Sequence, residues 1–399
     1  MRRAAVIGAG LTGTVTALCL SDAGVHVDLY ERNASPLLGA SGVNEGKIHL
    51  GYVYAMDQSL KTAKTMLRGA ACFRTILERW VGSAVFENHT SSSFSYAVPF
   101  SSMLDLDSIR AHFARVSMLS QNLGPHAMLA RETEAREQSG RELECAFDPE
   151  HVAASFKTNE IAIDPWALRL ALLSAVKDSK NITARYSTEI SSIHEDGTGY
   201  LVAGKDAQGM VSESYNAVVN ATWHQRLKLD ATFGIKRSQD AIHRYKCGLR
   251  STDPSVAKGL PSTTFIVGEY GDTVAYGDNA FVSWYPAGLI SQEVGLSPAI
   301  DDILLSSTRR ADLIESTLYN LQKLLPGASG SLSAKPESWE IVGGYISAWG
   351  KTGINHADSK LHDRYEVGVH SDGGYHSIDT GKFTLAPLFA TEVASRILE

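Results

Sequence analysis

Three glycines near the start of the chain have the spacing of a dinucleotide-binding turn. Gly8, Gly10 and Gly13 follow the apolar run AAVI at residues 4–7, which predicts a strand buried on both faces, and a helical pattern begins after Gly13. Gly8 permits a tight turn, Gly10 lets the backbone approach a pyrophosphate, and Gly13 lets the helix pack closely on the strand. We therefore expect the first turn of the helix to bind a diphosphate through its free N–H groups and its dipole.

A second predicted strand, VHVDLYE at residues 25–31, follows this helix and ends in an acidic residue. The Glu31 carboxylate can accept both hydroxyls of a ribose. A glycine turn that serves only to pack the helix on the strand is the alternative, but strand, glycines, helix, strand and acidic end follow the order typical of a dinucleotide site. This unit alone does not separate NAD from FAD, since both contain adenosine diphosphate.

Three later segments decide between the two cofactors. They are GASGVNEGKIHLGYVYA at residues 39–55, YNAVVNATW at residues 215–223, and GGYHSIDTGKFTLAPLFATEVASRILE at residues 373–399. In these segments the sequence resembles the D-amino acid oxidase-like (DAO) family of FAD-dependent oxidoreductases, which includes glycine oxidase, sarcosine oxidase, L-2-hydroxyglutarate oxidase and glycerol-3-phosphate dehydrogenase. The run SGVNEGKIHLGY is most similar to the hydroxyglutarate oxidase version of the family's second motif. The sequence has no second GxGxxG for a separate nicotinamide nucleotide, so FAD is the expected cofactor.

The resemblance implies that the two ends of the chain meet around the flavin. The turn at residues 381–384 supplies a helix start facing the flavin N1 and O2, where negative charge develops on reduction. Lys382 adds a positive charge there, unless it is simply an exposed lysine at a helix start. The backbone of residues 47–48 passes the flavin N5 edge, and Ile190 lies on the strand whose backbone pairs with adenine. The full set expected at the cofactor comprises Gly8, Gly10, Leu11, Thr12, Gly13, Glu31, Arg32, Ser41, Gly42, Lys47, Ile48, Ile190, Ala221, Thr222, Gly381, Lys382, Phe383 and Thr384.

The candidate catalytic residues follow from the chemistry that the resemblance implies. Members of the family take a hydride from a carbon bearing an amine or a hydroxyl group, and oxidation of an alcohol also needs a base. His49 is the first candidate because the resemblance places it beside the flavin edge; a structural hydrogen bond or a covalent link to the flavin are its alternative roles. Tyr375 and His376, in DGGYHSIDTG, are candidates for substrate contact or for packing. Lys351 is the fourth candidate, as a cation for the substrate.

One family feature is missing near the C-terminus. Amino acid oxidases of the family hold the substrate carboxylate with an arginine in a G-x-R pattern, but Ile346 stands at the matching place here. A simple amino acid is therefore disfavoured as the substrate. Lys351, Arg244 or Arg250 can replace the charge, although each is also typical of a solvated surface cation. The Trp-Tyr pair at residues 284–285 is predicted to line an apolar wall of the pocket or to pack in a sheet.

The elements that position these residues are predicted from hydrophobic periodicity. Helices are expected at residues 58–80, 108–123, 163–179 and 309–327. A C-terminal helix is expected to start near Phe383. A strand with an edge-type proline is expected at residues 91–100, and alternating apolar and polar residues predict antiparallel strands over residues 240–293.

The order of these elements implies an α/β fold with two domains. A Rossmann-like FAD-binding domain is formed by residues 1–82, 155–235 and 335–399. An antiparallel-sheet substrate (cap) domain is formed by residues 83–154 and 236–334. Because ligand pockets commonly lie between domains, we expect the flavin in the crevice where the two domains meet.

Composition limits the partners. The chain of 399 residues has a formal net charge of -7, which argues against nucleic acid and favours a small-molecule substrate. Four cysteines show neither a CxxC pair nor zinc-like spacing, so we expect no disulfide framework, no metal and a cytoplasmic location. The longest apolar run, WALRLALLSAV at residues 166–176, is too short for a membrane span. The oligomeric state is not set by these observations.

The expected function is therefore that of an FAD-dependent oxidoreductase, with the flavin reoxidised by oxygen or by a carrier. A 2-hydroxy acid and an amine are nearly equal as substrates at this point. The alternatives are a nicotinamide-dependent dehydrogenase and a flavin-holding protein with a structural or tRNA-modifying role.

Overall fold

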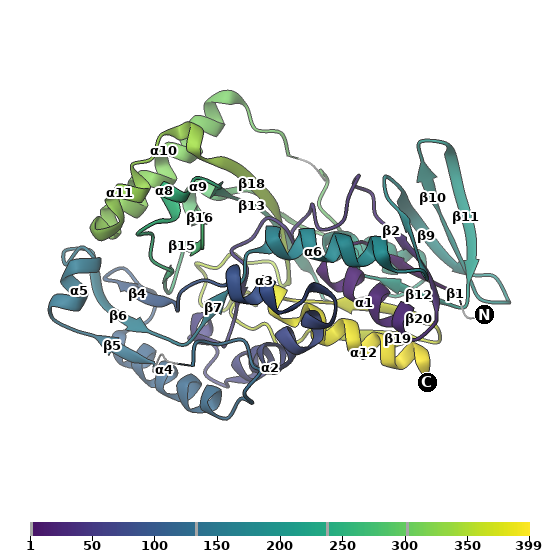
Figure 1. Cartoon of the computed structure of the whole chain (residues 1–399), viewed down its shortest axis with the longest axis horizontal. Helices are drawn as coiled ribbons and strands as arrows, with labels where there is room; N and C mark the ends of the chain where they lie inside the picture. Colours follow the sequence, from purple (N-terminus) through teal and green to yellow (C-terminus); the bar gives the residue numbers. More distant parts are fainter. Residues whose placement is uncertain (1–2, 132–134, 237–238, 301–302) are drawn as a thin grey trace.

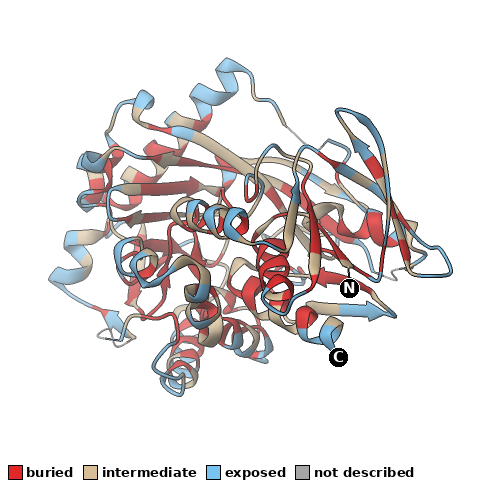
Figure 2. Ribbon diagram, turned by 45° about the vertical axis from the view of Figure 1, so that its right-hand side comes forward, coloured by how far each residue is buried: buried red, intermediate tan, exposed pale blue. Residues whose placement is uncertain are grey.

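The computed structural model of the chain describes residues 3–131, 135–236, 239–300 and 303–399. The molecule has two lobes (Figure 1). The first, the nucleotide lobe, contains a six-stranded sheet, which includes the first strand of the chain. It also contains the last helix of the chain. The second, the cap lobe, contains a nine-stranded sheet. Buried residues concentrate on the strands and on the helix faces turned toward them, and exposed residues lie on the outer helices and loops (Figure 2).

The six-stranded sheet has the order β19-β20-β12-β1-β2-β8, and only its β19–β20 pair is antiparallel. Parallel strands need cover on both faces. Ala4 and Val6 pack on helices at one face, whereas Ala5 and Ile7 pack on a separate three-stranded sheet at the other. The expected Rossmann-like α/β lobe is confirmed. The strands are β1 (Arg3–Ile7), β2 (His26–Tyr30), β8 (Ile182–Arg185), β12 (Ala217–Asn220), β19 (Gly368–Asp372) and β20 (Tyr375–Asp379), with β9 (Glu189–Glu195), β10 (Tyr200–Asp206) and β11 (Gly209–Tyr215) in the small sheet.

Four helices cover the first face of the six-stranded sheet: α1 (Leu11–Asp22), α2 (Lys61–Val81), α6 (Pro165–Asp178) and α12 (Ala386–Leu398). Helix α1 begins earlier than expected, at Leu11, because Gly10 is extended and the Ser41 hydroxyl accepts a hydrogen bond from the Leu11 N–H at 2.9 Å. Helix α6 begins where the Asp164 side chain accepts from the Trp166 N–H, and Pro165 has no N–H to satisfy. A 3₁₀ turn at residues 383–385 precedes α12.

The cap sheet has the order β17-β13-β16-β15-β14-β4-β6-β5, and β18 also pairs with β13. Helix α10 (Ser307–Leu324) packs on the β13 side of this sheet, and α4 (Leu106–Gln121) packs near β4 and β6. The strands are β4 (Ser95–Pro99), β5 (Arg136–Gln138), β6 (Val152–Lys157), β13 (Ala241–Ser251), β14 (Thr263–Phe265), β15 (Gly271–Tyr276), β16 (Asn279–Trp284), β17 (Leu289–Val294) and β18 (Glu340–Trp349).

A short antiparallel pair links the two lobes: β3 (Lys47–Ile48) pairs with β7 (Ile161–Ala162). The shorter helices are α3 (Ser83–Asn88), α5 (Arg141–Ala146), α7 (Arg226–Thr232), α8 (Pro254–Ala257), α9 (Tyr285–Gly288) and α11 (Ser329–Leu332). Across the described ranges, no helix is both long and apolar enough to cross a membrane.

Three details differ from the sequence expectations. The cap sheet is not wholly antiparallel, because β14 pairs with β4 in parallel. Strand β18 pairs along β13 in the cap sheet, whereas we expected all of residues 335–399 in the FAD-binding domain. Strand β4 lies inside the cap sheet, between β14 and β6, so Pro99 is not on an edge strand. The register of β4 on β6 shifts between Val98 and Pro99, and the missing N–H of the proline falls where regular pairing ends.

Candidate active site

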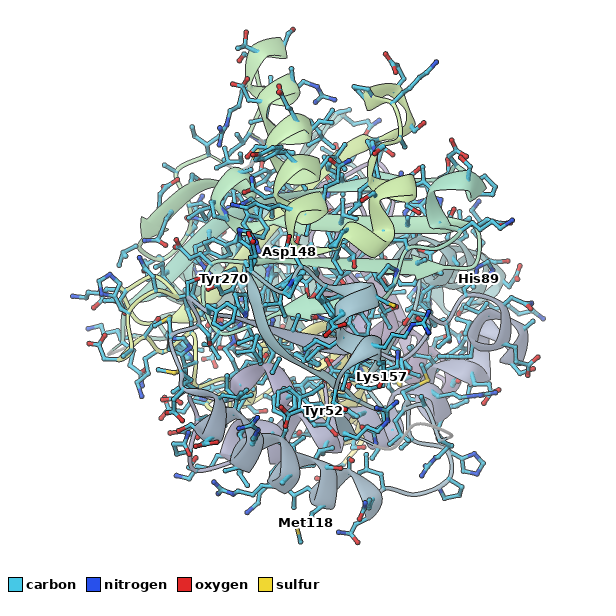
Figure 3. All side chains as sticks on the ribbon, turned by 90° about the vertical axis from the view of Figure 1, so that its left-hand side faces the viewer. Tyr52, His89, Met118, Asp148, Lys157 and Tyr270 are labelled. Atoms are coloured by element: carbon cyan, nitrogen blue, oxygen red, sulfur yellow. The ribbon has the colours of Figure 1, made fainter. Side chains whose placement is uncertain are left out.

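A cavity of about 430 Å³ lies between the two lobes. Its wall combines the β1–α1 turn and the C-terminal turn of the nucleotide lobe with residues of β13, β14 and β15 of the cap lobe. Tyr270 belongs to the cap side of this wall and is labelled in Figure 3, which faces the cap lobe. The cavity therefore lies where the sequence analysis expected a ligand, at the junction of the two lobes.

The glycines of the first turn are required by the closeness of the surrounding backbone. Gly8 has a φ of +94°, and a Cβ there would lie 2.7 Å from the Ala221 carbonyl oxygen. A Cβ on Gly13 would lie 1.9 Å from the Gly8 carbonyl oxygen, so the helix packs on the turn only through a residue without a side chain. Gly10 lines the cavity itself, and a side chain there would enter the space beside Ser41.

Helix α1 presents unpaired donors to the cavity. In the part of the chain that the structure describes, the N–H groups of Thr12 and Gly13 have no acceptor, while the Leu11 N–H is bound to Ser41 and the Thr14 N–H to the Gly10 carbonyl. Free N–H groups and the positive end of the helix dipole together favour an anion. A diphosphate therefore fits this end of the cavity.

Glu31 is held at the end of β2 by the turn itself. Its Oε2 accepts from the Ala9 N–H at 2.8 Å, and its Oε1 accepts from the Asn33 N–H at 2.9 Å and from the Asn33 side chain at 2.7 Å. The carboxylate still lines the cavity, and each oxygen has further lone-pair capacity for a ribose hydroxyl. Its position is thus set before a nucleotide binds.

The C-terminal turn meets the first turn of α1. The hydroxyls of Thr380 and Thr12 are hydrogen-bonded at 2.8 Å, so residues far apart in the sequence close the same end of the cavity. The carbonyl of Gly381, which has a φ of +65°, accepts from the Arg364 guanidinium at 2.7 Å. Behind the cavity wall, the buried Thr384 hydroxyl accepts from the His49 N–H at 2.9 Å and donates to the Lys47 carbonyl at 3.3 Å. These bonds lock the motif at residues 39–55 to the C-terminal turn.

Most residues expected at the cofactor line the cavity, and the others support its wall. The lining residues are Gly8, Gly10, Leu11, Thr12, Glu31, Arg32, Ser41, Lys47, Ile190, Ala221, Thr222, Gly381, Lys382 and Phe383. The remaining four, Gly13, Gly42, Ile48 and Thr384, lie behind it: a Cβ on Gly42 would lie 2.1 Å from the Leu37 carbonyl oxygen, and Ile48 is fully buried in the core.

His49 lies at the wall of the cavity between two carboxylates. Its Nδ1 is 3.5 Å from Oε1 of Glu160, and its Nε2 is 3.9 Å from Oε1 of Glu45. Burial lowers the pKa of His49, and the positive charges of Lys382 and Lys47 lower it further, so the imidazole is neutral. A neutral, buried imidazole can accept a proton.

Glu160 was not singled out from the sequence. It is fully buried, accepts from the Leu50 N–H at 2.6 Å and is hydrogen-bonded by the Tyr96 hydroxyl. Burial acts to raise its pKa, but His49, Lys47 and the Leu50 N–H outweigh burial and the pKa lies below its usual value. The carboxylate is therefore ionised beside the imidazole. Because it stands on the loop before β7, far from His49 in the sequence, no local pattern marked it.

Besides Arg32 and Lys228, five cations line the cavity, and four of these five form no ion pair with a carboxylate in the described part of the chain. The Lys47 ammonium is 2.6 Å from Asp272 and also donates to Thr264. The other four are Arg244, Lys246, Arg364 and Lys382. Burial, together with neighbouring cations such as Arg364, lowers the pKa of Lys382 to about 8. Such a cluster attracts negatively charged ligands.

Three of the predicted catalytic residues lie away from the cavity. Tyr375 is buried on the opposite side of β12 and β20, where its ring stacks on Phe233 at 4.2 Å and its hydroxyl donates to Asp230 at 2.7 Å. His376, the next residue along β20, points to the other face and is hydrogen-bonded to Ser371. Strand alternation buries both side chains before the chain reaches the cavity at Thr380.

Lys351 is the third of these corrections. It lies just beyond β18, its side chain is 67% exposed, and it forms an ion pair with Asp240 at 2.9 Å. Arg250 is also outside the cavity wall, where it pairs with Glu340. Arg244 and Tyr285 do line the cavity, whereas Trp284 does not.

Arg244 lies opposite the position at which the arginine of the G-x-R pattern is missing. Ile346 on β18 pairs directly with Arg244 on β13, and both line the cavity. Side chains directly opposite in an antiparallel pair project from the same face. The cation therefore comes from the adjacent strand rather than from β18. The alternating pattern of β13 also places Lys246 on this face, a signal that was present in the sequence but not used.

The four cysteines form no disulfide. Among the described residues, no cluster of three or more His, Cys, Asp or Glu side chains is arranged to hold a metal ion.

Comparison with known proteins gives the following. A family model described as DAO, FAD dependent oxidoreductase, matches residues 3–278. No curated protein matches the sequence. Among solved structures, glycine oxidase from Geobacillus kaustophilus superimposes with a TM-score of 0.67 at 14% identity, covering 99% of this chain and 95% of that chain. The FAD-bound L-alpha-glycerophosphate oxidase from Mycoplasma pneumoniae superimposes with a TM-score of 0.67 at 15% identity, covering 100% of this chain and 96% of that chain. Iminodiacetate oxidase from Chelativorans sp. BNC1 superimposes with a TM-score of 0.68 at 14% identity, covering 99% of this chain and 95% of that chain.

Proposed function

Because the chain belongs to the DAO family of FAD-dependent oxidoreductases, we propose that it takes a hydride from a carbon bearing a hydroxyl group in an anionic substrate. It is an enzyme and FAD is its cofactor, as the sequence resemblance predicted. Bound FAD supplies the hydride acceptor. The α1 N-terminus and Glu31 would hold its adenosine diphosphate, and the turn at residues 381–384 would face its ring.

The position of His49 in the cavity wall, with Nδ1 3.5 Å from the buried Glu160 carboxylate, is the observation that carries this proposal. Its Nε2 lies toward Glu45, a residue of the cavity wall, and its Nδ1 faces the buried Glu160. Loss of a hydride from an alcohol carbon leaves a carbonyl only if the hydroxyl proton also departs. In our proposal Nε2 accepts that proton, and Glu160 stabilises the imidazolium that forms.

The charge of the cavity favours a hydroxyl substrate over an amino acid. Arg244, Lys246 and Lys382 have no carboxylate partner in the described part of the chain. A substrate ammonium would be repelled by these cations, whereas a carboxylate or a phosphate would be attracted. Arg244, which stands opposite Ile346, is our candidate for the anion anchor because its guanidinium can bind a carboxylate through two hydrogen bonds.

Oxidation of an amine is the second candidate, and Glu45 is the observation that favours it. This carboxylate lines the cavity, and its nearest ionisable contact is His49 Nε2 at 3.9 Å. A substrate ammonium placed here would be stabilised by Glu45. The two candidates therefore differ in whether Glu45 or His49 meets the reacting group.

Anaerobic bleaching of the flavin absorbance with matched pairs of compounds tests the proposal. Each pair shares a carbon skeleton and differs only in a hydroxyl or an amino group, as in lactate and alanine or 2-hydroxyglutarate and glutamate. We expect the hydroxyl member of at least one pair to bleach the flavin and its amino partner to leave it oxidised. Bleaching by amino members alone would move the assignment to amine oxidation. Bleaching by neither class would reject the proposal.

A further inference from the structure

Two of the unpaired cations form a separate group on the cap lobe. Arg244 and Lys246 are two residues apart on β13, so their side chains project from the same face of the sheet, and both line the cavity. Arg364 and Lys382 belong instead to the segment around the C-terminal turn, where Arg364 donates to the Gly381 carbonyl. The cavity thus has one pair of cations at the turn expected to face the flavin and a second pair on the opposite lobe.

Tyr285 joins Arg244 and Lys246 into one binding surface. The Arg244 guanidinium donates to the Tyr285 hydroxyl at 2.7 Å, and the Lys246 ammonium lies 4.4 Å from the centre of the Tyr285 ring. Because the Tyr285 oxygen accepts from Arg244, its own proton is free to be donated to a ligand. Three kinds of donor, a guanidinium, an ammonium and a phenol, therefore meet at the cap wall.

Within the described residues, no carboxylate forms an ion pair with Arg244 or Lys246. Asp272, the carboxylate facing the group from β15, is already engaged by Lys47 and Thr264, and Glu45 lies beside His49. Arg244 is only 5% exposed, and its Nε is buried with no acceptor in the described residues. Burial lowers the pKa of Lys246, and the positive charges of Arg244 and Lys47 lower it further. The negative charges of Asp272 and Glu45 act to raise it. Buried cations without a counter-charge are costly, so a bound anion would stabilise this group.

We propose that Arg244, Lys246 and Tyr285 together bind the anionic part of the substrate, and that this part carries two negative charges. The chemistry that fits is either a phosphate monoester or a dicarboxylate. Arg244 suits bidentate binding of either group, and Lys246 adds a point charge. The identity of the reacting end rests on the proposed function, but the binding of a dianion does not.

Titration of the FAD-loaded enzyme with anions that cannot be oxidised tests this inference. Acetate serves as the monoanion, malonate and succinate as dicarboxylates, and methyl phosphate as the phosphate monoester, all at one ionic strength because salt screens these charges. Binding is followed by perturbation of the flavin absorption spectrum and by the shift in Tm. We expect at least one dianion class to bind about tenfold or more tightly than acetate, which corresponds to one additional charge-assisted contact. The class of dianion that binds more tightly shows whether the site takes a phosphate monoester or a dicarboxylate.

Variants connect this preference to the named residues. Lys246→Met is expected to reduce dianion affinity about tenfold and to leave acetate binding within about twofold. Lys351→Met is the matched control, since Lys351 is exposed and paired with Asp240, and it should leave both affinities unchanged. Arg244→Met is the second test variant, judged only if its flavin spectrum and Tm match those of the parent.

The outcomes separate the two proposals. Equal affinity for acetate and for every dianion, or a Lys246→Met variant with parental dianion affinity, would overturn the inference even if a hydroxyl substrate is oxidised. Tight dianion binding that Lys246→Met removes would support it even if no hydroxyl compound bleaches the flavin, in which case only the proposed function fails.

Discussion

The two ends of the cavity are built in different ways. At the end where we propose the FAD diphosphate, the wall consists of backbone N–H groups of α1, glycines of the first turn, and Glu31 held within the same turn. At the substrate end, the wall consists of side chains from strands far apart in the chain, such as Lys47, Arg244 and Asp272. The first end depends on a short contiguous motif, while the second depends on which strands become neighbours.

This difference has an energetic consequence. Backbone donors at a helix start can be presented to solvent or ligand at little cost, because their positions follow from the helix itself. The charged side chains of the substrate end are desolvated, and they tolerate burial only through partners such as the Lys47–Asp272 pair or through a bound anion. We therefore expect mutations at the nucleotide end to affect the presence of FAD and mutations at the substrate end to affect rate and affinity.

The largest effect is expected for Gly10→Leu. The side chain would occupy the position of the diphosphate beside Ser41, so the variant should purify without flavin. Absorbance of the purified protein measures this loss. Gly330→Ala is the matched control, because a Cβ there meets nothing within 4 Å, and it should keep its flavin. Normal flavin content in Gly10→Leu would contradict the diphosphate assignment.

The next largest effect is expected for His49→Gln, which tests the substrate end. Removal of the base should slow anaerobic flavin reduction by about 10²- to 10⁴-fold, while the flavin stays bound because its nucleotide contacts are elsewhere. Stopped-flow reduction and the flavin spectrum measure the two properties separately. An unchanged rate of reduction would remove His49 from the mechanism.

Glu160→Gln should have a smaller effect, because Glu160 acts through His49 as a positioning residue. The rate of reduction is expected to fall roughly tenfold. The acid limb of the pH–rate profile should also move to lower pH, since the lost carboxylate had favoured protonation of His49. Glu160→Asp keeps the charge and should restore part of the rate. A lower rate in Glu160→Gln with an unmoved acid limb would indicate a structural role only.

The smallest effect is expected from pH acting on Lys382. Its pKa of about 8 means that the ammonium is charged below pH 8 and loses its charge as the pH rises through that value. The KM for an anionic substrate should therefore rise roughly two- to fivefold between pH 7 and pH 9. In Lys382→Met this step should be absent. A step of equal size in the variant would assign it to another group.

Some of this site was predictable because the signal is local. Gly8, Gly13 and Glu31 lie within one strand–turn–helix–strand unit, in which Gly8 has a φ of +94°, Gly13 packs against the Gly8 carbonyl, and Glu31 accepts from the Ala9 N–H. The helices at 61–81 and 165–178 were similarly close to prediction, since apolar spacing and capping act over a few residues. The resemblance to the DAO family then placed the C-terminal turn beside the N-terminal one, as the Thr12–Thr380 bond shows.

Other residues were misplaced because their environment is set by distant strands. Tyr375 and His376 are close to the cavity in sequence, but the pleat of β20 turns one toward Phe233 and the other toward Ser371. Lys351 was expected to replace the charge of the arginine that is missing at position 346, yet its side chain is exposed and paired with Asp240. Position along the chain could not show which face of a sheet receives each side chain.

The sequence by itself determined the family, the cofactor and the glycine turn at residues 8–13, because these depend on residues within one local unit or within recurrent motifs. The tertiary structure alone decided that Glu160 backs His49, that Arg244 stands opposite Ile346, and which cavity cations lack a carboxylate partner among the described residues. The physical reason is that charge pairing depends on distance in space. Strand pairing sets that distance, and the order of residues along the chain does not.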